Sequence, residues 1–70
     1  MRVPFSTLFT VNEDGSLEPK VRIRMGGVTI GPGFKFTRGV NIAGLDLTQY
    51  VTHDLEVTQQ DDVFIITGIY

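Results

Sequence analysis

Apolar and polar residues alternate in this chain in short runs, and the clearest run lies near its middle. Residues 20–25 read Lys-Val-Arg-Ile-Arg-Met, so three apolar side chains alternate with Lys20, Arg22 and Arg24. A period of two is typical of a β-strand with one buried and one solvated face. The run therefore predicts a strand whose solvated face carries a row of basic side chains about 7 Å apart.

Further strands are predicted on both sides of this run. Phe5–Val11 is rich in Phe, Thr and Val, which suit a pleated, half-buried surface. Asn12–Ser16 follows as a turn because it contains Asp-Gly. Near the C-terminus, Leu55–Thr58 and Val63–Tyr70 flank the polar loop Gln59–Asp62. This arrangement predicts a terminal hairpin with a four-residue loop.

The returning strand of this hairpin is apolar on both faces. Such a strand is either covered on both sides or presents one face to another subunit. Its apolar residues are therefore candidate contact residues, and the set that stays outside the core forms the predicted contact surface. Strict alternation sorts them into two sets, which are Val63, Ile65 and Ile69 on one face, and Phe64, Ile66 and Tyr70 on the other.

A six-residue pattern fills the middle of the chain. Units that begin at positions 27, 33 and 39 run glycine, apolar, polar, apolar, followed by two turn-like residues. They predict short strands at Val28–Ile30, Phe34–Phe36 and Val40–Ile42, with both apolar side chains of a unit on the same side. The spacing resembles hexapeptide β-helix repeats, but three units form only one coil, which has no neighbours to cover it. The pattern therefore favours tight arches or hairpins with glycine at the corners.

The only helical candidate is Asp46–Thr52. Asp46 can cap a helix, and Gln49 stands three residues later, as in a capping box. The sequence thus predicts an all-β fold, in a single small domain over residues 1–70. We expect a barrel or sandwich of about five to six short strands, with one short helical turn near residues 46–52 and a C-terminal hairpin.

Composition restricts the chemistry that this domain can perform. The chain has no cysteine, which excludes disulfides, thiolate metal sites and cysteine nucleophiles. The single histidine, His53, lacks the partners of a zinc site, so no metal and no cofactor are predicted. An enzyme remains an alternative only with a site assembled between subunits, for which His53, Asp54 and Tyr50 are the candidates.

Charge is distributed unevenly. Residues 1–38 hold all six basic and three acidic residues, whereas residues 39–70 hold five acidic residues. One interpretation is that strands from the two halves pair their charges. The other is that Lys20, Arg22 and Arg24 bind nucleic acid or another anionic ligand. A pI near 5.0 counts against nucleic acid, since most small nucleic-acid modules are basic.

We therefore expect a non-enzymatic module for protein interaction or self-assembly, and homo-oligomers are favoured because a 70-residue core is small. Binding of an anionic ligand and catalysis between subunits are the alternatives. No stretch approaches the roughly 18 apolar residues of a membrane helix. Without a visible targeting segment, the default expectation is a cytoplasmic location.

Overall fold

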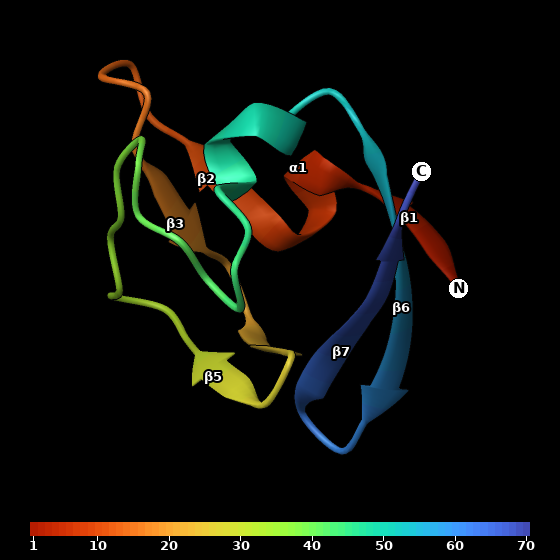
Figure 1. Ribbon diagram of the computed structural model, residues 1–70. Coiled ribbons are helices and arrows are strands. Elements are labelled where there is room, and N and C mark those ends of the chain that lie inside the picture. The colour runs from red at the N-terminus through yellow and green to blue at the C-terminus, as the bar shows by residue number, and fades with distance from the viewer.

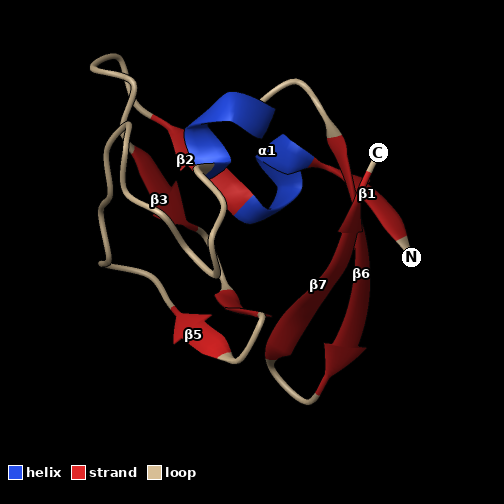
Figure 2. Ribbon diagram, in the orientation of Figure 1, coloured by secondary structure: helices blue, strands red, loops and turns tan.

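The fold consists of two β-sheets and two single helical turns. The computed structural model describes all 70 residues. Five strands form one sheet in the order β1-β6-β7-β4-β5, and two form a smaller sheet, β2-β3 (Figure 1, Figure 2). The strands of the large sheet are β1 (Arg2–Pro4), β4 (Arg22–Met25), β5 (Val28–Ile30), β6 (Asp54–Gln60) and β7 (Val63–Ile69), and those of the small sheet are β2 (Phe9–Val11) and β3 (Leu17–Pro19).

The all-β prediction is confirmed. Of the two predicted architectures, a barrel or a sandwich, the closed barrel is wrong because the two sheets do not close. Seven strands form instead of five to six. The C-terminal hairpin is also confirmed. Its loop is shorter than predicted, because Gln60 pairs with Val63 and leaves only Asp61 and Asp62 in the turn. Asp61 adopts a φ of +55°, which lets the chain reverse within two residues.

The core lies between the two sheets. Helix α1 (Phe5–Leu8) and the 3₁₀ turn η1 (Leu47–Tyr50) lie at one end of the space between β2–β3 and the β6–β7 hairpin (Figure 1). Thirteen apolar residues are buried there, and every element except β1 contributes at least one. They are Phe5, Leu8, Phe9, Leu17, Ile23, Met25, Ile30, Phe36, Ile42, Leu47, Leu55, Val57 and Ile66.

The strand predicted over Phe5–Val11 is wrong in its first half, where α1 forms instead. Only Phe9–Val11 is extended, as β2. The cause is the spacing of three large apolar residues. In a strand Leu8 would point away from Phe5 and Phe9, whereas one helical turn places positions i, i+3 and i+4 on the same side. All three are at most 1% exposed, so burial decides in favour of the turn.

The prediction of three short strands in the six-residue pattern is confirmed only for β5. Residues 34–36 and 40–42 form no strands, and only Phe36 and Ile42 make isolated bridges, to Leu17 and Leu45. The two apolar side chains of a unit also fail to share an environment. In each unit the first is exposed and the second is buried, which leaves Val28, Phe34 and Val40 exposed and Ile30, Phe36 and Ile42 buried.

In the units that begin at positions 33 and 39, β-turns explain why the first apolar residue is exposed and the second is buried. Gly33 and Gly39 have φ values of +94° and +91°, which glycine adopts at little cost. The N–H of Phe34 donates to the carbonyl of Gly31 at 3.1 Å, and the N–H of Val40 donates to that of Thr37 at 3.2 Å. Each glycine therefore closes a β-turn, and the first apolar residue of the unit belongs to that turn rather than to a strand.

The helical turn predicted near residues 46–52 is confirmed as η1. Asp46 caps it, since Asp46 Oδ1 accepts from the N–H of Thr48 at 3.1 Å and from its hydroxyl at 2.6 Å. Asp46 Oδ2 also accepts from the N–H of Gly39 at 3.1 Å, which joins the turn before Val40 to η1. The hydrogen bond from the Thr48 hydroxyl, above all, lowers the pKa of Asp46.

This lowered pKa predicts a loss of stability in acid. A carboxylate whose pKa is lower in the folded than in the unfolded chain stabilises the fold above the unfolded pKa, and this contribution is lost as the pH falls through the folded pKa. Asp46→Asn should therefore lower the melting temperature at neutral pH and flatten its decline as the pH falls below the ordinary aspartate pKa of 3.8. Asp61→Asn is the matched control, because the Asp61 carboxylate makes no hydrogen bond or ion pair in the structure. Equal acid profiles for the two variants would contradict this role of Asp46.

Candidate interaction surface

The face of the large sheet that points away from the core carries two apolar side chains. β4 runs parallel to β7, and its register pairs Arg22 with Val63 and Arg24 with Ile65. Paired residues in a sheet point to the same face. Ile23, which lies between the two arginines, is 1% exposed and points into the core. Val63 and Ile65 are half-buried and therefore lie on the opposite face beside Arg22 and Arg24.

Strand β6 provides the other flank of this surface. Its register with β7 pairs Thr58 with Ile65 and Gln60 with Val63. Glu56 lies two residues before Thr58 and on the same face, because side chains alternate along a strand. We call the surface formed by Arg22, Arg24, Val63, Ile65, Glu56, Thr58 and Gln60 the outer face.

A β-bulge determines which residues of the last strand reach the outer face. Val57 pairs with Ile66 and Glu56 pairs with Gly68, so Thr67 is an extra residue on β7. An extra residue shifts the alternation of all residues that follow it. The strict sorting into two sets is therefore wrong beyond the bulge. Phe64, Ile66 and Ile69 belong to or pack against the core, while Val63, Ile65 and Tyr70 lie outside it.

The predicted basic row is reduced to two residues. Lys20 precedes β4, and its N–H donates to the carbonyl of Leu8 at 2.8 Å. Its Nζ donates to the carbonyl of Ser6 at 2.8 Å. Lys20 therefore lies beside α1, and the prediction that it shares a strand face with Arg22 and Arg24 is wrong.

The two remaining arginines differ in their contacts. Arg22 forms an ion pair with Asp62 at 3.5 Å, and both side chains are exposed. Arg24 Nε donates to the Thr29 hydroxyl at 3.4 Å and has no acidic partner. Exposed ion pairs contribute at most about 1 kcal/mol. Because Arg24 has no acidic partner within the chain, its positive charge is available to another molecule.

A charged and aromatic cluster closes one end of the outer face. Arg2 on β1 forms an ion pair with Asp54 at 2.9 Å and lies 4.0 Å from the centre of the Tyr70 ring. The Tyr70 hydroxyl donates to Glu56, which also contacts the amino group of Met1. Hydrogen bonds from Met1 first, and then from Tyr70, lower the pKa of Glu56, while the bond to Glu56 raises the pKa of Tyr70. Glu56 is therefore held as a carboxylate on this face.

The candidate catalytic residues do not form an acid–base pair. His53 and Tyr50 are close, with ring centres 5.3 Å apart. Nδ1 of His53, however, contacts the carbonyl oxygen of Tyr70, and the Asp54 carboxylate is bound to Arg2. Asp54 therefore does not orient the imidazole as a relay would require.

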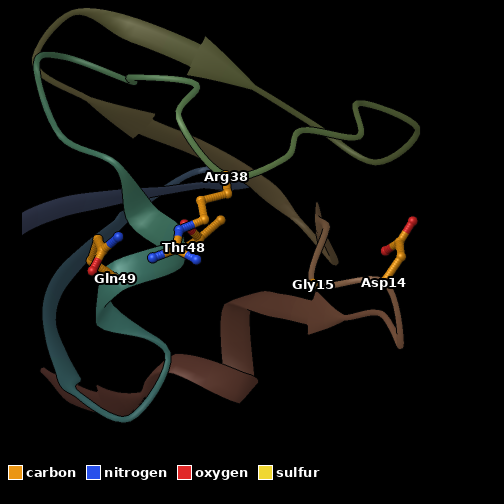
Figure 3. Close-up of a pocket in the computed structure, with 5 residues that line it drawn as sticks. All are labelled: Asp14, Gly15, Arg38, Thr48 and Gln49. Atoms are coloured by element: carbon orange, nitrogen blue, oxygen red, sulfur yellow. The ribbon is translucent and has the colours of Figure 1, made fainter.

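Two cavities open on the surface. The larger, of about 410 Å³, is lined only by polar residues and glycine, namely Asp14, Gly15, Arg38, Thr48 and Gln49 (Figure 3). The smaller, of about 260 Å³, borders β7 at the bulge and is lined by Met25, Leu45, Ile66, Thr67, Gly68 and Ile69. The polar cavity was not predicted from the sequence, because it joins three separate segments and no local pattern marks it.

No three His, Cys, Asp or Glu side chains lie close enough together to bind a metal ion. None of the helices has the length and apolar character needed to cross a membrane.

Comparison with protein families, curated proteins and solved structures finds no match for this chain.

Proposed function

We propose that this protein is a non-enzymatic module that forms a homodimer through the outer face of its large sheet. The observation that carries the proposal is the position of Val63 and Ile65. They lie on the central strand of the sheet, with arginines on one side and hydrogen-bonding residues and a carboxylate on the other. Interfaces combine a small apolar centre with a polar rim in this way.

The distribution of charge favours a second copy as the partner. A two-fold axis parallel to β7 places β4 of one subunit opposite β6 of the other, and most homodimers have two-fold symmetry. Val63 and Ile65 then meet their own copies on the axis. Arg24 is paired with Ile65, and Ile65 is paired with Thr58, so the three residues lie at the same height along the strands. Across the axis, Arg24 therefore faces Thr58 of the partner subunit. Glu56 of the partner subunit lies two residues, or about 7 Å, further along that strand. An arginine side chain spans that distance, so opposite charges meet twice across the axis.

Self-association is tested by a matched pair of valine substitutions. Light scattering after size exclusion should give a dimer for the unmodified protein at about 100 µM, and Val63→Glu should raise the dissociation constant at least about tenfold. Val11→Glu is the control, since Val11 is 49% exposed on β2 in the other sheet and should leave the dimer intact. Circular dichroism checks that both variants fold. A monomeric unmodified protein, or equal dissociation by both variants, would overturn the proposal.

The charge arrangement has its own test. Arg24→Glu should weaken the dimer, and the double variant Arg24→Glu/Glu56→Arg should restore part of the lost affinity if the two residues meet across the axis. Glu56→Arg alone also removes the contacts of Glu56 with Met1 and Tyr70, so a double variant that loses at least the sum of the two single-variant losses would exclude this axis.

A further inference from the structure

The polar cavity has features of a ligand site that are independent of the outer face. It lies between the turn that joins β2 to β3, the turn at Arg38, and η1 (Figure 3). Its lining contains no apolar side chain. Such a cavity favours a ligand that is recognised by hydrogen bonds and charge rather than by apolar contact.

Arg38 is the residue with unused binding capacity. A guanidinium group carries five N–H donors in a fork that fits carboxylate and phosphate oxygens. Figure 3 shows that the Arg38 side chain extends toward η1, where Thr48 and Gln49 line the same wall. It is also the only basic side chain in the structure without an ion pair or hydrogen bond. The others are bound as Arg2 to Asp54, Lys20 to Ser6, Arg22 to Asp62, Arg24 to Thr29 and Lys35 to Asp14.

The acidic residues near the cavity are already engaged. The Asp14 carboxylate accepts from the N–H and the hydroxyl of Ser16 and pairs with Lys35 at 3.5 Å. In Figure 3 it points away from Arg38. Asp46 accepts its hydrogen bonds from Thr48 and from the backbone of residue 39. Neither carboxylate binds the Arg38 guanidinium, so its charge is available for an external anion.

From this geometry we infer that the cavity binds one oxyanion group, a carboxylate or a phosphate, of a small soluble molecule. The fork of Arg38 makes the charged contact. The β2–β3 turn at Gly15 forms the opposite wall and limits the size of the group.

Titration with inorganic phosphate and, separately, with acetate tests the inference and distinguishes the two sources of oxyanion. Amide and Arg38 Nε–H resonances are followed by NMR at constant ionic strength. At least one of the two anions should produce saturable shifts at Gly15, Arg38, Thr48 and Gln49. Arg38→Gln should weaken this binding at least about tenfold.

Arg24→Gln is the matched control, because Arg24 also lacks an acidic partner but lies on the outer face. Its effect on the titration should be less than about twofold. Three results would overturn the inference, namely shifts that do not saturate with either anion, equal losses for the two variants, or shifts spread over all basic residues. The dimer does not affect this test, since the cavity contains no residue of the outer face.

Discussion

Phe9→Ala is expected to remove about 3–5 kcal/mol of stability, which is from about a third to all of the stability of this small domain. Phe9 is 1% exposed, its ring stacks on Phe5 at 4.6 Å, and it meets the ring of Phe36 edge-on at 6.2 Å. Removing a buried phenyl ring costs about 3–5 kcal/mol. A domain of this length has only about 4–10 kcal/mol of stability in total, at 0.05–0.15 kcal/mol per residue. Urea unfolding followed by circular dichroism measures the loss.

Phe34→Ala is the control for this prediction. Phe34 also contacts Phe36, with ring centres 5.8 Å apart, but it is 44% exposed in a turn. Its replacement should cost less than about 1 kcal/mol. If Phe9→Ala is too unstable to measure, Phe9→Leu should give an intermediate loss, because leucine keeps part of the buried volume. Equal losses of unfolding free energy for Phe9→Ala and Phe34→Ala would contradict the difference in burial between the two rings.

Those parts of the fold that depend on local pattern could be predicted from the sequence. The alternation before Met25 marks β4, the polar residues before Val63 mark the terminal hairpin, and Asp46 marks the start of η1. Each of these elements is specified by neighbours within a few residues. Helix α1 shows the limit of that reasoning, because β-propensity favoured a strand there and burial of three apolar side chains prevailed.

The candidate surface could be predicted only in part. Arg24 and Ile65 were both identified as candidates, but the parallel pairing of β4 with β7 that brings them together joins segments about 40 residues apart and leaves no sequence signal. The bulge at Thr67 is equally hidden, since an extra residue in one strand is defined only against its partner. Arg38 could not be identified as a candidate residue from the sequence, because its neighbours in the cavity come from other segments of the chain. Its cavity exists only when three distant turns come together.

A contact between two turns gives the second large prediction, at Gly26. Gly26 and Gly27 join β4 to β5, with φ values of +57° and +84°. A Cβ atom at Gly26 would lie 2.6 Å from the Cβ atom of Ala43, whereas one at Gly27 would meet no atom within 4 Å. Alanine at position 27 should therefore cost only the backbone strain of about 1–2 kcal/mol. Gly26→Ala adds the overlap with Ala43, for a total of about 2–5 kcal/mol.

The overlap and the strain can be separated by changing Ala43 as well. Ala43 itself has a φ of +51°, so Ala43→Gly should relieve strain and remove the methyl group that Gly26→Ala would strike. In the Ala43→Gly background, Gly26→Ala should cost about 1–2 kcal/mol, the same as Gly27→Ala. Urea midpoints for the four members of this cycle measure the coupling. An unchanged cost of Gly26→Ala in both backgrounds would mean that the turns do not touch. A coupling of about 1–3 kcal/mol would show that the turn at Ala43 is held against the β4–β5 hairpin, which positions Leu45 beside β7.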